Sequence, residues 1–258
     1  MDAPLRLDHF RSPALAAWRA SARHPVVLWP VGSVEPHGPH LPLDTDTTIA
    51  LENAERAAVA LRAAGVAAVV APPLPYGVTE FARDFPGAIS LPADVLIGVL
   101  VAGVAAFLRD GFAHVCLINH HLEPGQLDAL EAARARIAAA HGEAAVSVPQ
   151  VISRRWGRQL TAEFKSGACH AGSYETSLVL AVHPDRVATA TAEALPAVPV
   201  SLSAAIQAGA TSFLEAGAEA AYTGTPAAAT AAEGEATYAV LARMVATEVQ
   251  EHLERMTP

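Results

Sequence analysis

Short apolar runs rich in β-branched residues alternate along this chain with alanine-rich stretches of helical length. The apolar runs cover residues 25–32, 66–77, 114–119 and 144–152. The stretches between them cover residues 47–65, 93–110 and 125–142, and two of them end in glycine, which commonly stops a helix. Strands separated by helices of this length predict βαβ units. We therefore expect an α/β fold, a three-layer αβα sandwich with a mostly parallel central sheet.

The remainder of the chain adds two expected helices and one irregular region. Residues 173–184 predict a helix that ends before Pro184, and residues 233–256 predict a long closing helix. Residues 187–229 are rich in Pro, Gly and Ser, which favours irregular structure. We find no internal repeat and no linker, so we expect one domain over residues 1–258.

Composition and charge exclude several classes of function. The 258 residues have a formal net charge of −9 and no basic stripe, so neither nucleic acid nor an anionic membrane is an expected partner. The apolar run 95–108 is too short to span a bilayer, and acidic residues interrupt any signal-peptide pattern near the start. Cys116 and Cys169 are too few for a disulfide framework. We expect a cytoplasmic protein.

Ionisable residues gather directly after two of the expected strands. The stretch "PVGSVEPHGPHLPLDTD", residues 30–46, places five of them within twelve positions: Glu35, His37, His40, Asp44 and Asp46. His120, His121 and Glu123 follow the strand at 114–119. Ligands bind outside the carboxyl ends of strands in sheets of this kind, so both segments are candidates for a functional site.

The spacing within these segments suits metal binding. Glu35 and His37 are two positions apart, as are His121 and Glu123, and in extended backbone such side chains point the same way. With Asp46 they form a five-ligand set of nitrogens and oxygens that suits two divalent ions such as Zn²⁺ or Mn²⁺. Each short pattern alone is more often a solvated loop, so a metal site and loop polarity both remain open at this point.

Three motifs resemble those of the creatininase (creatinine amidohydrolase) family. Residues 30–46 resemble its first signature, "LINHHLEP" its second motif, and "HAGSYETSLVLAVHPDRV" its third. "YGVTEFARDFPGAISL" and "TGTPAAATAAEGEA" resemble two weaker segments, and the similarity runs in the family's order from about Val27 to Gly234.

The resemblance implies a pair of metal ions bridged by one carboxylate. Glu35, Asp46 and His121 would bind the first ion, and His37, Asp46 and Glu123 the second. Metal-bound hydroxide would attack the carbonyl carbon of the substrate. His170 would then carry the proton to the leaving nitrogen, with Glu123 as the other catalytic residue.

Supporting roles fall to residues beside these ligands. His40 and Asp44 are not expected on the metals: His40 would lie behind the ligands or be structural, and Asp44 would lie behind the ligands or be a solvated loop residue. Glu175 would orient His170, or it would simply favour the dipole at the start of its helix.

Some positions depart from the family's pattern. Ser173 stands where many members have glutamate, and Glu123 would supply that carboxylate, which indicates the creatininase-like branch. Ser166 stands where creatininases have a ring-stacking tryptophan. His120 replaces a glycine, and Trp156 matches a second ring-contacting tryptophan unless it merely anchors a surface loop. We expect His120, Trp156 and Ser173 to line a more polar pocket for a substrate other than creatinine.

Taken together, the residues and the resemblance imply an enzyme. The expected reaction is metal-dependent hydrolysis of a non-peptide C–N bond in a small amide, with a cyclic amide favoured. The alternatives are a peptidase or deformylase of the same family, or a non-catalytic metal-binding oligomer. The resemblance also implies a homo-oligomer, commonly a hexamer.

Overall fold

A parallel sheet lies at the centre of the structure. The computed structural model describes residues 3–256, and within them four strands form one sheet in the order β2-β1-β3-β4. The central strand β1 (Val26–Val31) pairs with β2 (Ala68–Val70) and with β3 (His114–Asn119), which in turn pairs with β4 (Val146–Ser147). All three pairings are parallel. The expected α/β fold with a parallel sheet is confirmed.

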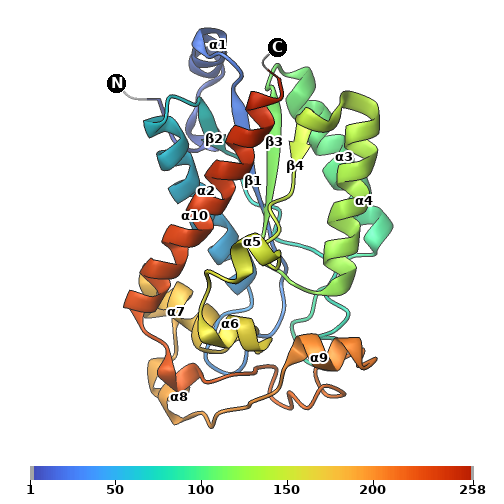
Figure 1. The fold of residues 1–258 in the computed structure, drawn as a ribbon, viewed down its shortest axis with the longest axis vertical. Helices are drawn as coiled ribbons and strands as arrows, with labels where there is room; N and C mark the ends of the chain where they lie inside the picture. Colours follow the sequence, from blue (N-terminus) through green and yellow to red (C-terminus); the bar gives the residue numbers. More distant parts are fainter. Residues whose placement is uncertain (1–2, 257–258) are drawn as a thin grey trace.

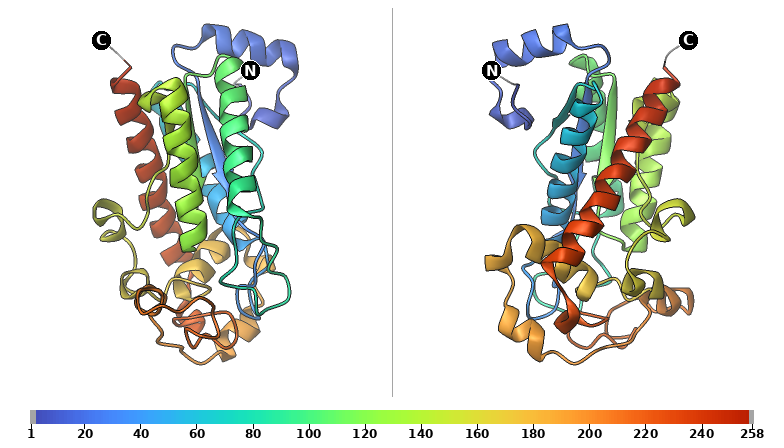
Figure 2. Two further views of the ribbon diagram at one scale, coloured as in Figure 1. Left: turned by 90° about the vertical axis from the view of Figure 1, so that its right-hand side faces the viewer. Right: turned by 60° about the vertical axis from the view of Figure 1, so that its left-hand side comes forward.

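Alternate residues of β1 belong to two separate hydrophobic clusters, one on each face of the sheet. Val26 and Leu28 pack with side chains of α2 (Thr45–Ala63), α7 (Ser173–Val182) and α10 (Ala231–Glu254). Val27, Trp29 and Val31 pack with those of α3 (Ala93–Arg109) and α4 (Pro124–His141). Because successive side chains of a strand point to opposite faces, this pattern requires helices on both sides. Figure 2 shows the three layers that result.

The helix ends follow the signals in the sequence. α2 ends just before Gly65, and α4 begins at Pro124 and ends before Gly142. Both glycines have a positive φ, 83° and 93°, which a residue with a Cβ rarely adopts. The Thr230 side chain accepts a hydrogen bond from the Glu233 N–H and so caps α10.

Several short helices were not predicted from the sequence. They are α1 (Ser12–Ser21), α5 (Arg154–Gly157), α6 (Ala162–Ser166), α8 (Thr189–Ala194) and α9 (Leu202–Gln207). Turns of 3₁₀ helix add η1 (Leu7–His9), η2 (Glu143–Ala145), η3 (Pro184–Arg186) and η4 (Pro226–Ala228).

The short helices α5, α6, α8 and α9 gather at the carboxyl ends of the strands, and α1 lies at the opposite end (Figure 1). A third, smaller hydrophobic cluster packs loop segments at this end, with Phe81, Leu202 and Phe213 among its buried residues. Among the helices of residues 3–256, none combines the length and apolarity needed to span a membrane. The loops that leave β1 and β3 open toward this same end, where the candidate site lies.

Candidate metal centre and active site

The segment that leaves β1 carries Glu35 and His37 into the interior. Gly38 has a φ of 64°, and its N–H donates to the carbonyl oxygen of Ala221, which ties this loop to the segment that carries Ala221. His37 Nδ1 donates to the Glu35 carbonyl oxygen at 3.1 Å, so Nε2 faces the neighbouring carboxylates. That Nε2 atom is buried and has no hydrogen-bond partner. A buried nitrogen left without a partner among carboxylates suits a metal ligand.

Asp46 lies between two histidines in the first turn of α2. Its Oδ1 is 3.3 Å from His37 Nε2, and its Oδ2 is 3.2 Å from His121 Nδ1. The Ser33 hydroxyl donates to Oδ2 at 3.1 Å and fixes the carboxylate. Asp46 therefore presents one oxygen to each of two histidines.

His121 follows β3 and presents one ring nitrogen to the same carboxylates. Its Nε2 donates to the Val78 carbonyl oxygen at 2.7 Å, which leaves Nδ1 as the acceptor. Nδ1 lies 3.1 Å from Glu35 Oε1. A backbone carbonyl that orients a histidine in this way is a common partner of metal-ligating rings.

Glu175, rather than Glu123, accompanies His37 and Asp46. Its Oε2 is 3.5 Å from His37 Nε2 and accepts a hydrogen bond from the Ala171 N–H at 2.6 Å. The Glu123 carboxylate instead accepts from the N–H groups of Glu80 and Phe81 at 3.0 and 3.1 Å. It is 3.7 Å from His121 Nε2, the nitrogen that already donates to Val78. The expected grouping of Glu123 with His37 therefore differs from the structure, because two backbone donors hold Glu123 on the other side of His121.

Five residues thus form what we call the donor cluster: Glu35, His37, Asp46, His121 and Glu175. Among the described residues, possible ligand atoms come within 4.8 Å of one another in the sets Glu35–Asp46–His121, His37–Asp46–Glu175 and Glu35–His37–His170. The first two sets share Asp46. The mixture of imidazole nitrogen and carboxylate oxygen is that of zinc and manganese sites.

Electrostatics within the donor cluster favour bound positive charge. Burial opposes protonation of His37, but the Asp46 and Glu175 carboxylates outweigh it and raise the His37 pKa to about 10. Burial itself raises the pKa of Glu175 to about 8. The pKa of Asp46, despite its burial, lies far below its ordinary value because of His37 and His121. Three carboxylates buried this closely need cations for compensation, and divalent ions can supply that charge in place of protons.

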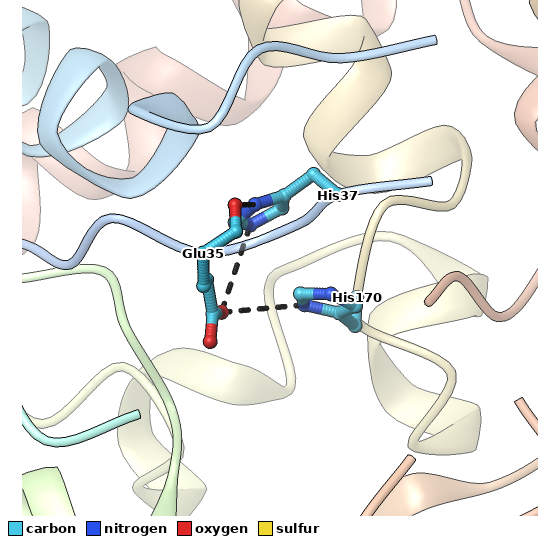
Figure 3. A group of neighbouring side chains, drawn as sticks. All are labelled: Glu35, His37 and His170. Carbon is cyan, nitrogen blue, oxygen red and sulfur yellow. Dashed lines mark hydrogen bonds and ion pairs between the residues drawn. The ribbon is translucent and has the colours of Figure 1, made fainter. Parts of the chain in front are cut away.

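His170 lies beside the donor cluster with a defined tautomer. Its Nε2 donates to the Pro36 carbonyl oxygen at 2.9 Å, and its Nδ1 is 3.7 Å from Glu35 Oε1 (Figure 3). The ring lies between His37 and Phe213, each with a centroid distance of 4.3 Å. Burial and the neighbouring His37 lower the His170 pKa to about 4. The ring is therefore neutral near pH 7, and its Nδ1 carries an unprotonated lone pair.

His40 and Asp44 lie outside the donor cluster. His40 Nε2 bonds the hydroxyl of Thr176 at 2.9 Å, on α7. Asp44 precedes α2 and pairs with Arg186 at the surface. His40 thus links the loop after β1 to α7, and Asp44 links it to η3.

A cavity of about 430 Å³ opens beside the donor cluster, but three expected pocket residues do not line it. His120 Nε2 accepts from the Asn53 amide at 3.0 Å, so the ring lies against α2. Trp156 is buried in a hydrophobic cluster, and Ser173 begins α7. The lining is also mainly apolar, which differs from the expected polar pocket, because His120 is directed away from it.

Cys169 and His170 both line this cavity, which raises the question of a thiol nucleophile. Burial, with the Glu175 and Glu163 carboxylates, raises the pKa of the Cys169 thiol to about 12. A reactive cysteine needs the opposite shift. This shift argues against Cys169 as a thiolate nucleophile near neutral pH.

Sequence reasoning missed residues that hold the site in place. The Thr79 hydroxyl donates to Glu35 Oε2. The Glu163 carboxylate accepts from the N–H groups of Tyr174 and Thr225, next to the segment that carries His170. Thr79 lies in one of the weaker resembling segments, which was the available signal; Glu163 lies in a helix too short to be recognised.

Known proteins resemble this chain in sequence and in fold. The family model of creatininase (creatinine amidohydrolase) matches residues 9–249. The chain belongs to the creatininase family. Its hydrolase character, expected above, is confirmed by this membership and by relatives named as peptidases and amidohydrolases.

Relatives within the creatininase family carry different names. The chain is 34% identical over 228 residues to the mycofactocin precursor peptide peptidase of Mycolicibacterium smegmatis, covering 88% of this chain and 85% of that one. It is 28% identical over 186 residues to the creatinine amidohydrolase of Pseudomonas putida, covering 66% and 68%. A solved creatininase with manganese superposes with a TM-score of 0.73 at 22% identity, covering 99% of this chain and all of that one, which concerns the fold alone.

Proposed function

We propose that this protein hydrolyses an amide C–N bond at a centre of two divalent cations. The observation that carries the proposal is Asp46, whose two oxygens each face a different histidine. The Glu35–Asp46–His121 set would hold one ion, and the His37–Asp46–Glu175 set the other. Bound divalent ions would polarise the substrate carbonyl and acidify water.

The residues around the ions would transfer protons and orient the ligands. His170 can accept a proton at Nδ1, because Nε2 is already engaged with Pro36, and can release it to the leaving nitrogen. Glu123 also lines the cavity, and burial raises its pKa to about 7, a value suited to proton transfer near neutral pH. Thr79 and Ser33 keep Glu35 and Asp46 oriented.

A small cyclic amide is the substrate that the sequence motifs favour. A second candidate is the amide bond of a peptide. The volume of the cavity and the similarity to peptidases favour this second substrate. Hydrolysis of cyclic amides and of short peptides by the same Zn²⁺- or Mn²⁺-loaded preparation distinguishes the two.

The test of the metal centre compares two glutamates by elemental analysis. We expect about two divalent ions per chain after loading, as two-metal hydrolases require. Glu175→Gln should lose about one ion, whereas Glu123→Gln should retain both and lose turnover. The exposed Glu219→Gln serves as control.

Two results would contradict the proposal. A correctly folded wild type that takes up neither Zn²⁺ nor Mn²⁺ would remove the metal centre. Loss of an ion from Glu123→Gln but not from Glu175→Gln would reassign the second site.

A further inference from the structure

The cavity beside the donor cluster has two chemically different parts. The residues of the first part are ionisable: Glu35, Asp46, His121, Glu123, His170 and Glu175. The second part is a wall of large apolar side chains. We call it the apolar wall, and it consists of Phe81, Leu122, Leu127, Ile152, Leu202, Ile206 and Phe213. A pocket that is mostly apolar with a few polar groups at one end orients a ligand of matching character.

Several separate segments build the apolar wall. Leu127 comes from the start of α4, Ile152 from the loop after β4, and Ile206 from α9. Phe81 and Phe213 pack edge to face at 5.1 Å and close the wall near His170. Because His170 itself stacks on Phe213, the apolar surface begins directly beside the proton acceptor.

Part of the apolar wall is open to water. Ile152 is 54% exposed, although it borders the cavity. Water against a concave apolar surface is displaced favourably by an apolar group. The wall therefore suits an apolar occupant better than a hydrated one.

The charges around the cavity argue against an anionic occupant of this part. None of the described residues that line the cavity is lysine or arginine. The polar side chains contributed by α9 are Ser203 and Gln207, which are neutral. A carboxylate placed against the apolar wall would lose hydration without gaining a cationic partner.

We propose that the substrate is an amide bearing an uncharged apolar substituent, such as a branched alkyl chain or an aromatic ring, which binds against the apolar wall. The proposal rests on the amidohydrolase function above and names its substrate class. The amide group lies at the donor cluster, and the substituent extends toward Leu127, Ile206 and Phe213. A substrate with a carboxylate on that substituent is discriminated against.

Alkyl hydroxamates provide a test, because the hydroxamate group chelates divalent metals while the tail can be varied. The Zn²⁺-loaded protein is titrated by calorimetry with acetohydroxamate, butanohydroxamate and hexanohydroxamate. Burial of each methylene should lower Kd by about fourfold. A hydroxamate of the same length as hexanohydroxamate that ends in a carboxylate should lose most of this gain.

The outcomes separate this inference from the function on which it rests. If none of the hydroxamates binds, the metal centre fails. If all bind with the same Kd, or if the carboxylate-ended tail binds best, the metal centre stands and the apolar wall is not the substrate site.

A pair of variants locates the effect. Ile206→Ala should reduce the affinity ratio between hexanohydroxamate and acetohydroxamate several-fold. Leu214→Ala should leave it unchanged, because Leu214 is exposed and does not line the cavity. Urea midpoints of both variants verify that they are folded. An unchanged ratio in Ile206→Ala would overturn the assignment of this wall.

Discussion

The Glu163 carboxylate accepts two backbone hydrogen bonds, and its removal should loosen the segment that carries His170. Its Oε1 accepts from the Tyr174 N–H at 2.8 Å, and its Oε2 accepts from the Thr225 N–H at 2.7 Å. A hydrogen bond to a charged group contributes about 1.5–3 kcal/mol. Because Glu163 is only half-buried and water can replace part of each bond, we expect Glu163→Ala to lower the free energy of unfolding by about 2–4 kcal/mol.

A second substitution at this position separates charge from size. Glu163→Gln keeps one acceptor oxygen but turns an amide NH₂ toward the other N–H, so it should lose about one such bond, roughly 1.5–3 kcal/mol. Urea unfolding followed by circular dichroism measures both changes, with m-values compared to the wild type. Glu219→Ala, at an exposed glutamate, is the control. If Glu163→Ala and Glu219→Ala agree within about 0.5 kcal/mol, the reasoning about these two hydrogen bonds is refuted.

Three further perturbations test other parts of the structure. Burial lowers the His114 pKa from 6.5 to about 4, so the folded state favours the neutral ring. The stability of the fold is therefore full above pH 6.5 and falls as the pH decreases toward 4. Between pH 7 and pH 4.5, the free energy of unfolding measured in urea should fall by about 2–3 kcal/mol less for His114→Gln than for the wild type. Leu130→Ala, at a fully buried site, should cost about 2–5 kcal/mol in thermal unfolding, whereas the exposed Val59→Ala should cost under about 0.5 kcal/mol. Asn53→Ala should lower the free energy of unfolding by about 1–3 kcal/mol, because it removes the hydrogen bond to His120. The ratio of kcat/KM between amide substrates should stay unchanged, and a changed ratio would indicate that His120 contributes to the substrate pocket.

The regular elements of the fold were predictable because their signals are local. The run at 114–119 coincides with β3, and Gly65 and Gly142 stop α2 and α4 as expected. The helices α5, α6, α8 and α9 were missed because four to six residues are too few to show a helical period. Their stability depends on tertiary packing, which a sequence pattern does not contain.

The site was predictable only as far as strand ends bring residues together. Glu35, Asp46 and His121 meet because β1 and β3 are neighbours in a parallel sheet. Glu175 rather than Glu123 lies with His37, and the Val78 carbonyl turns His121 Nε2 away from Glu35 and Asp46. Residue spacing has no information on such a contact. Assembly into a homo-oligomer stays a prediction.

The donor cluster and much of the apolar wall rest on different parts of the hydrophobic interior. The donor residues extend from β1, β3, α2 and α7, whose side chains form the two clusters on the faces of the sheet. Phe81, Leu202 and Phe213 belong instead to the third cluster, formed by α9 and the loop segments around it. Apart from Phe213, on which His170 stacks, substitutions in this cluster would reshape the proposed binding surface at little risk to the sheet or to the reactive groups. Such an arrangement makes substrate preference an evolvable property: a lineage can acquire a new substrate while inheriting the same chemistry.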